Sequence, residues 1–271
     1  MKIKDIVNRD IVNLTNCDQE PIHIPGSIQP HGFLFGIDKG SRKIEFCSEN
    51  AEMFTGKSYS FLLGKTFDEA FGSQLHKTVS AHFNVENVLN KTPLKVHFGN
   101  AMVELRVHQN DGYYILEGEF FNPKDQLSNV YEQTVKFISY MKDTDTLKDL
   151  CNLVAKGTRE VTGYDRVMVY RFDSDYNGEV FAEDCREDLE PFFGLHYPHT
   201  DIPAQARELY MRNVTRLIAD IGYTPVPIYT FDDGSNKNLD LSLSILRSTS
   251  PIHVEYLQNM GVGATLTISL I

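Results

Sequence analysis

A thiol, a histidine pair and a third histidine are the side chains with the clearest potential for chemistry in this sequence. Cys17 lies in a non-periodic segment crowded with Pro and Gly, so it is the least core-like of the four cysteines, although such thiols are more often incidental than reactive. His196 and His199 form an HxxH pair without the further ligands that a zinc site needs. His253 falls on the apolar face of an expected helix, where a histidine is more often a hydrogen-bonded core group than a catalyst.

A stretch around Asp201 combines a helix start with charged side chains. Thr200 or Asp201 is expected to cap a helix that begins at Pro203, and Arg212 and Arg216 follow along it. The expected apolar face of this helix consists of Ala206, Leu209, Tyr210, Val214, Leu217 and Ile221. By itself, this pattern is typical of a capped surface helix with solvated arginines.

The last segment predicts a helix followed by a strand. Ser250 and Pro251 predict the helix start, with the serine hydroxyl as the cap and proline at the first helical position. The expected inner face consists of His253, Tyr256, Leu257 and Met260, and Gly261 ends the helix. The following strand has one face made only of hydroxyls (Thr265, Thr267 and Ser269), so that face meets water or a ligand. Because the chain ends inside this strand, we expect the second domain to be truncated.

The elements that position these residues predict two α+β domains. In the first half, strands are expected at 33–38, 43–48, 103–109 and 113–120. Short helices lie between residues 50 and 90, broken at Gly56, Gly64 and Gly72, and Asn110-Asp111-Gly112 predicts a tight hairpin. We expect an irregular segment over 1–32, a first domain over 33–123 and a second domain over 124–271.

The second domain is expected to begin with two helices and a strand. The helices cover about 125–141 and 146–162, and the strand covers 166–172. The inward face expected for the helix over 146–162 consists of Leu147, Leu150, Cys151, Val154 and Val161. Cys151 is interpreted as a core residue because a buried thiol packs as a small hydrophobe.

Composition excludes several classes of protein. The 271 residues are 41% hydrophobic and 23% charged, which excludes a disordered chain and fits two globular domains. The net charge of −11 argues against nucleic acid or an anionic membrane as a partner. No apolar run reaches the length of a membrane span, and residues 1–5 show no apolar signal core, so we expect a cytoplasmic protein. The four cysteines are widely separated, which predicts free thiols.

Three motifs resemble those of the phytochromes. They are Cys17 followed by Pro25–Gly32 (PGSIQPHG), Asp201–Arg207 (DIPAQAR) and Leu246–Val262 (LRSTSPIHVEYLQNMGV). The motifs are long and follow the family's order. The resemblance extends over nearly the whole chain and is to the bacteriophytochrome branch, which implies a PAS domain followed by a GAF domain.

This resemblance implies a red/far-red photoreceptor that carries a linear tetrapyrrole and signals through isomerisation of ring D. Cys17 stands where the biliverdin-binding branch has the cysteine that forms a thioether to the ring A vinyl group. In the plant and cyanobacterial branch the linking cysteine immediately precedes the motif histidine, and that position is Ile252 here. The expected cofactor is therefore biliverdin, attached through Cys17, rather than phycocyanobilin or phytochromobilin.

The resemblance also implies roles for single residues. The backbone carbonyl of Asp201 is expected to face the pyrrole N–H groups, and His253 to lie against the tetrapyrrole near a propionate. One propionate is expected to be held by Arg216, Arg247 and Tyr210, because a guanidinium matches a carboxylate. The other is expected to be held by Ser250, Thr265 and Thr267. The expected walls of the ring D pocket are Met168, Tyr170, Tyr197, Ile202 and Tyr256, and Pro203 completes the cofactor-binding residues.

The sequence also departs from the family's pattern. Tyr197 stands where the family usually has Phe, which adds a hydroxyl near ring D, and Thr200 stands where Ser is common. The PHY domain, the output module and the family's second GAF histidine are absent from these residues. We therefore expect the output domain outside this chain and no enzyme activity within it. The resemblance also implies that the segment around Ile28 threads a GAF loop as a knot. Long amphipathic helices would form a homodimer or pack within the chain.

Two other functions remain open from the sequence. One is a PAS–GAF sensor that binds a small molecule or haem and does not respond to light. The other is an enzyme with Cys17 as nucleophile and His23 or His31 as base, although no Ser, Asp or Asn partner to orient the base is evident.

Overall fold

The computed structural model describes residues 20–83, 92–122, 135, 137–139, 142, 144–231 and 237–271. The chain divides into two compact units, one from residues 1–121 together with 204–271, and one from residues 122–203. Both units mix helices with antiparallel sheets, so the α+β class is confirmed. None of the helices in the described ranges has the length and apolar character that a membrane span requires.

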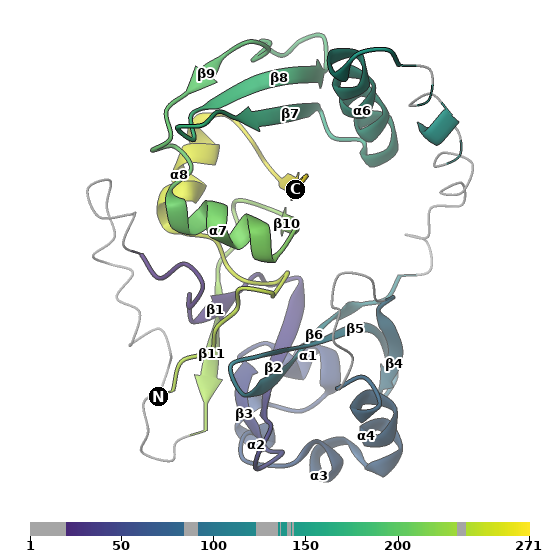
Figure 1. The fold of residues 1–271 in the computed structure, drawn as a ribbon. Helices are drawn as coiled ribbons and strands as arrows, with labels where there is room; N and C mark the ends of the chain where they lie inside the picture. Colours follow the sequence, from purple (N-terminus) through teal and green to yellow (C-terminus); the bar gives the residue numbers. More distant parts are fainter. Residues whose placement is uncertain are drawn as a thin grey trace. The chain divides into compact units, whose positions relative to one another are not determined.

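The first unit is organised around one antiparallel sheet of seven strands (Figure 1). The order across the sheet is β1-β11-β3-β2-β6-β5-β4. In chain order the strands are β1 (Ser27–Ile28), β2 (Gly32–Asp38), β3 (Ile44–Ser48), β4 (Leu94–Phe98), β5 (Ala101–Asn110), β6 (Tyr113–Phe120) and β11 (Val226–Thr230). The strands predicted for the first half are confirmed, whereas the sequence pattern predicts none of β1, β4 and β11.

Several turns and helix ends in this unit lie at glycines. The predicted hairpin joins β5 to β6, with Asp111 at φ +42° and Gly112 at φ +83°, the left-handed conformations of a type I′ turn. The helices are α1 (Ala51–Thr55), α2 (Tyr59–Leu62), α3 (Phe67–Phe71) and α4 (Ser73–Ser80). Gly56 ends α1 at φ +70°, and Gly72 separates α3 from α4 at φ +84°, as the sequence predicts.

The central strands of this sheet are apolar on both faces. Side chains alternate along β2, so Phe33, Phe35 and Ile37 pack against the helices, while Leu34 joins a second cluster on the other face. That second cluster consists of Ile28, Leu34, Phe46, Ile115, Ile228, Leu239, Leu241 and Leu246. The second face is thus covered by a segment from the far end of the chain, and this part of the core is not visible in the sequence pattern.

Residues 20–29, the N-terminal segment, lie between two stretches of the chain's second half. Ile28 in β1 pairs with Val226 in β11, and it also forms a β-bridge to Arg247. β11 in turn pairs with β3, so the N-terminal segment is tied to the edge of the main sheet. The expected knot stays a prediction, because residues 1–19 lie outside the described residues.

The remaining elements of the first unit are α7 (Ala204–Arg212), β10 (Thr215–Ile218), α8 (Pro251–Asn259) and β12 (Thr265–Ile268). β10 and β12 form a two-stranded antiparallel sheet. The helix expected from Pro203 through Ile221 is therefore wrong beyond Arg212. Its apolar periodicity continues, but residues 215–218 gain ladder hydrogen bonds to β12, and this long-range pairing overrides a local pattern.

The second unit consists of α6 (Leu147–Thr162) and a three-stranded sheet of β7 (Arg166–Phe172), β8 (Gly178–Cys185) and β9 (His196–Tyr197). The predicted second helix and the strand after it are confirmed. Two of the expected inward residues are wrong, because Leu147 is 62% exposed and Val161 is 38% exposed. The buried residue of α6 is Ala155, and Val161 lies about 120° around the helix from it. Most of the expected helix over 125–141 lies outside the described residues.

Gln29 links the N-terminal segment to β10. Its side chain is fully buried, and its Nε2 donates to the carbonyl of Leu217 at 2.8 Å while its Oε1 accepts from the backbone N–H of Ala219 at 3.1 Å. The backbone N–H of Gln29 donates to the carbonyl of Leu246 at 2.7 Å. One residue thereby fixes three segments that are distant in sequence.

We expect Gln29→Ala to lower the free energy of unfolding by about 1–3 kcal/mol, because it leaves a buried donor and a buried acceptor without partners. The matched control is Gln74→Ala on α4, where the side chain is exposed and the effect should stay within about 0.5 kcal/mol. Urea unfolding of both variants measures the difference. Equal stability of the two variants would contradict this role of Gln29.

Candidate functional site

Two buried arginines are the most unusual electrostatic feature of the first unit. Arg216 on β10 is 9% exposed, and Arg247, in the segment before α8, is 8% exposed. Arg216 Nη2 donates to Thr249 Oγ1 at 3.0 Å, and Arg247 Nη1 donates to the carbonyl of Ile22 at 2.6 Å. Arg216 Nη1 and Arg247 Nε are buried without a hydrogen-bond partner. Both guanidinium groups therefore have unused donors.

Neither guanidinium forms an ion pair with an Asp or Glu of the described residues. Burial, followed by the nearby charge of Arg216, lowers the pKa of Arg247 to about 9. Burial likewise lowers the pKa of Arg216. A buried cation without an anion is costly. The arrangement is therefore suited to an anionic ligand with more than one acceptor oxygen.

A buried carboxylate positions the segment that carries Arg247. Glu117 on β6 is 3% exposed, and its two oxygens accept from the backbone N–H groups of Ile245 at 3.2 Å and Leu246 at 2.8 Å. His108 Nδ1 lies 3.7 Å from the same carboxylate. Burial raises the pKa of Glu117 to about 7, although the two backbone donors act in the opposite direction. The residue before Arg247 is thus fixed to the main sheet.

His253 and two tyrosines accompany the arginines. Burial, together with the charges of Arg216 and Arg247, lowers the pKa of His253 to about 4, so its imidazole is neutral at pH 7 and has one donor and one acceptor. The ring of His253 lies nearly parallel to that of Tyr256, with centroids 6.2 Å apart. Burial raises the pKa of Tyr210 on α7, which keeps its phenol protonated.

The hydroxyl face predicted for the last strand lies beside one arginine. Thr267 on β12 is the ladder partner of Arg216, and Thr265 is that of Ile218. Directly opposed residues share one face of a sheet, so Thr267 and Arg216 project to the same side. Both threonines are partly buried. The sequence pattern thus predicts the hydroxyl face but not the arginine next to it.

The predicted start of α8 at Ser250-Pro251 is confirmed, but the expected cap by the Ser250 hydroxyl is wrong. Its hydroxyl makes no capping bond to α8 and instead donates to Glu20 Oε2 at 2.5 Å. No local sequence pattern predicts this contact, because the two residues are 230 positions apart. Thr249 and Tyr223 are further site residues that the sequence does not single out, with the N–H of Thr249 donating to the Tyr223 hydroxyl at 2.7 Å.

The predicted site residues from Met168 to Pro203, which precede α7 in the chain, lie in the second unit. Tyr170 on β7 and Tyr197 on β9 have ring centroids 6.2 Å apart, and Met168 is 38% exposed on the same strand as Tyr170. The Tyr170 hydroxyl packs directly on Gly178, where an added Cβ would lie 1.8 Å from it. Asp201 is exposed, and its N–H donates to the carbonyl of Pro198 at 3.0 Å. The predicted residues therefore fall in both units, with Ile202 and Pro203 partly buried in the second, and Cys17 lies outside the described residues.

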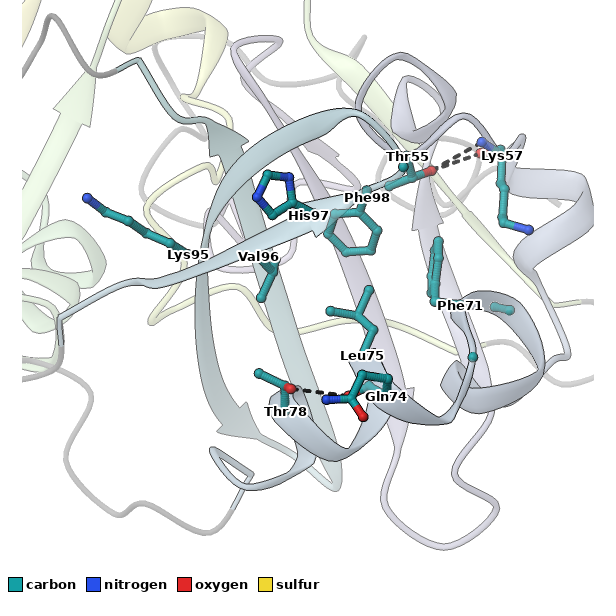
Figure 2. A pocket seen from close by; sticks show the side chains of 13 residues that line it. Thr55, Lys57, Phe71, Gln74, Leu75, Thr78, Lys95, Val96, His97 and Phe98 are labelled. Carbon is teal, nitrogen blue, oxygen red and sulfur yellow. Dashed lines mark hydrogen bonds between the residues drawn. The ribbon is translucent and has the colours of Figure 1, made fainter.

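Other features of the described residues carry less chemistry. An open pocket of about 730 Å³ lies in the first unit. Phe71, Leu75 and Phe98 are among its lining residues (Figure 2). Its two lysines are engaged elsewhere, with Lys57 Nζ over the Phe61 ring and Lys95 Nζ over the Phe121 ring. None of the predicted site residues lines it. No group of three His, Cys, Asp or Glu side chains within the described part of the chain could hold a metal ion.

Comparison with known proteins places these units in a family. The PAS fold family matches residues 17–121, and the GAF domain family matches residues 146–271. "Cyanobacterial phytochrome B" from Nostoc sp. is 38% identical over 100% of this chain and 37% of its own length. A "Bacteriophytochrome" from Pseudomonas aeruginosa is 38% identical over 96% of this chain and 36% of its own length. The chain thus spans little more than a third of these relatives.

Solved structures agree with the sequence relatives. The chromophore-binding domain of a Stigmatella aurantiaca phytochrome superposes with a TM-score of 0.80 at 39% identity, over 94% of this chain and 86% of that one. The photosensory core module of a Stigmatella aurantiaca phytochrome gives a TM-score of 0.85 at 39% identity, over 96% of this chain and 53% of that one. The expected PAS and GAF domains are confirmed, and the chain belongs to the phytochrome family, in which it resembles the chromophore-binding domains of bacteriophytochromes.

Proposed function

We propose that this chain binds biliverdin and serves as the light-sensing part of a red/far-red photoreceptor. The observation that carries the proposal is the pair of buried arginines, Arg216 and Arg247, with unused donors and no carboxylate partner among the described residues. Biliverdin has two propionate carboxylates, and a guanidinium matches a carboxylate in shape and charge. The relatives' membership in the phytochromes supports the same assignment.

The residues of the first unit fit such a ligand. Arg216, Arg247 and Tyr210 are proposed to hold one propionate, and Thr265 and Thr267 to donate to the other. His253, neutral at pH 7, would donate one hydrogen bond and accept another beside the pyrrole rings. Each of these groups is a donor or can act as one, as a ligand rich in acceptor oxygens requires.

The residues of the second unit keep their proposed roles. Asp201 would accept the pyrrole N–H groups through its backbone carbonyl. The proposed walls of the ring D pocket are Met168, Tyr170, Tyr197, Ile202 and Tyr256, and Pro203 is a further proposed cofactor-binding residue. When bound, the pigment supplies light absorption and isomerisation at the double bond between rings C and D, while the protein positions it and excludes water.

Cys17 is the proposed attachment point. Its S–H would add across the ring A vinyl group, with sulfur bonding to one carbon and the proton going to the other, so that no oxidant or leaving group is needed. Cys17 precedes Glu20, the first described residue, by three positions. The match to the PAS fold family begins at Cys17.

The whole protein's activity is a further proposal. Because the relatives are nearly three times as long as the matched region, we propose PHY and output domains outside this chain and no catalysis within it. We retain the boundaries 1–32, 33–123 and 124–271, a homodimer through long helices, and a cytoplasmic location as proposals. The apolar side chains that α6 exposes, Leu147 and Val161, are consistent with a helix-mediated dimer.

The attachment is tested by denaturing the pigmented protein. We expect wild type to keep biliverdin on the chain in denaturant and Cys17→Ser to lose it, while both show a red band before denaturation. Cys185→Ser on β8 is the matched control and should retain the pigment. Intact mass measures retention, and a wild-type chain that releases all its pigment would remove Cys17 as the anchor.

The arginine pair is tested with biliverdin and its dimethyl ester, which lacks both negative charges. Wild type should bind the diacid at least about tenfold more tightly than the diester, since charge-assisted bonds are about twice as strong as neutral ones. Arg216→Met and Arg247→Met should bring the two affinities together. Arg212→Met, on exposed α7 surface and paired with Glu208, should leave the ratio unchanged. Equal binding of acid and ester by wild type would refute the propionate assignment.

Gly178 provides a test of the Tyr170 position. Alanine at this position would force the Tyr170 ring away, because the new Cβ would lie 1.8 Å from its hydroxyl. We expect Gly178→Ala to retain pigment but to shift the red band and change the photoconversion yield. Gly263→Ala, where nothing lies within 4 Å, is the control and should leave the spectrum unchanged. A Gly178→Ala spectrum identical to wild type would exclude Tyr170 as a pigment contact.

A further inference from the structure

Thr249 orients the guanidinium group of Arg216. Arg216 lies on β10 and is 9% exposed, and its Nη2 donates to Thr249 Oγ1 at 3.0 Å. Its Nη1 is buried and has no hydrogen-bond partner among the described residues. Because the guanidinium group is planar and rigid, a bond at Nη2 restricts the directions in which Nη1 can point. The free donor of Arg216 is therefore held in place by a bond at the other terminal nitrogen of the same group.

Thr249 is held in turn by a tyrosine. Thr249 is 7% exposed, and its backbone N–H donates to the Tyr223 hydroxyl at 2.7 Å. A buried backbone N–H needs an acceptor, and here a side chain supplies it in place of a backbone carbonyl. Tyr223 packs against Ile218 at the end of β10, against Ile221 and against Leu257 on α8. The phenol is thus fixed between β10 and α8.

The acceptors that orient Arg216 are neutral. The hydroxyls of Thr249 and Tyr223 both accept, and neither donates its own proton to an acceptor within the described part of the chain. A carboxylate in the place of Thr249 would also orient the guanidinium group, but it would neutralise the charge that attracts an anionic ligand. A hydroxyl orients Arg216 and leaves its positive charge available to a ligand.

We propose that Tyr223 and Thr249 are positioning residues that hold Arg216 with its Nη1 donor available to a propionate of the pigment. This inference rests on the proposed function, because the propionate belongs to the proposed ligand. Tyr223 acts through Thr249, and Thr249 acts through Arg216. Since both residues act through a cation, their effect should appear with a charged ligand and be absent with a neutral one.

The affinities for biliverdin and for its dimethyl ester test the role of Thr249, in a Cys17→Ser background that keeps binding reversible. Thr249→Val removes the acceptor and should weaken binding of the diacid about fivefold, while the affinity for the diester changes less than about twofold. Thr249→Ser keeps a hydroxyl and should restore the wild-type affinity. If Thr249 instead competes with the ligand for Arg216, Thr249→Val strengthens binding of the diacid and the proposal is wrong. Equal diacid affinities with Thr and with Val would also overturn it.

Tyr223→Phe tests the second step, because it removes the hydroxyl and keeps the ring. Binding of the diacid should weaken about threefold, again without a change for the diester. The double variant with Thr249→Val should bind no more weakly than Thr249→Val alone, since both act through the same bond to Arg216. Losses that add up in the double variant would contradict the order Tyr223, Thr249, Arg216.

An Arg216→Met background separates positioning from a general effect on the fold. Thr249→Val should then change the diacid affinity less than about twofold, because no guanidinium group remains to be positioned. A fivefold loss that persists in this background would refute the positioning role. The matched controls are Tyr229→Phe on β11, whose hydroxyl bonds to Glu49 Oε1 at 2.9 Å, and Thr162→Val on α6. Both controls should leave the two affinities unchanged.

NMR of the pigment-free protein keeps this inference separate from the proposed function. We expect slow rotation about the Cζ–Nη2 bond of Arg216 in wild type and Thr249→Ser, and faster rotation in Thr249→Val and Tyr223→Phe. The amide of Thr249 should also exchange faster in Tyr223→Phe. If these changes occur in a protein that never binds biliverdin, the photoreceptor assignment fails while the bonds that orient Arg216 are confirmed. If the protein binds the diacid and Arg216 rotates equally fast with Thr and with Val, the positioning role alone is refuted.

Discussion

The charge of two buried guanidinium groups is the constraint around which the first unit is arranged. Arg216 and Arg247 lie close enough that the charge of one lowers the pKa of the other, and neither meets a carboxylate among the described residues. Such an arrangement destabilises the fold unless an anion neutralises it. The two propionates of the proposed pigment would supply that negative charge and accept hydrogen bonds from the free donors.

The structure positions these arginines from both ends of the sequence. Arg216 is carried by β10, which Gln29 fixes through two side-chain hydrogen bonds. Arg247 is carried by a segment that Glu117 fixes to the main sheet from one side and the N-terminal segment contacts from the other. The stability of the sheet and the geometry of the arginines are therefore coupled, so a substitution at Gln29 or Glu117 should affect both.

Local patterns in the sequence predict the elements that depend on interactions between residues close in sequence. The strand at 33–38, the turn at Asn110–Gly112 and the end of α1 at Gly56 follow from alternation and from glycine's access to positive φ. The failures lie where distant segments meet. The helix expected beyond Arg212 becomes β10 because β12 pairs with it, and the Ser250 hydroxyl bonds to Glu20 instead of capping α8. The resemblance of the motifs to a known family predicts the site residues. Periodicity alone does not predict that Arg216 and Arg247 are buried.

The photoreceptor assignment is tested most directly by the absorbance of the full-length protein mixed with biliverdin, recorded before and after red illumination and again after far-red illumination. We predict a strong red band that red light diminishes and far-red light restores, as expected when ring D isomerises in a fixed pocket. A protein that binds no pigment, or a red band that light leaves unchanged, would contradict the photoreceptor assignment and favour a PAS–GAF sensor of another ligand.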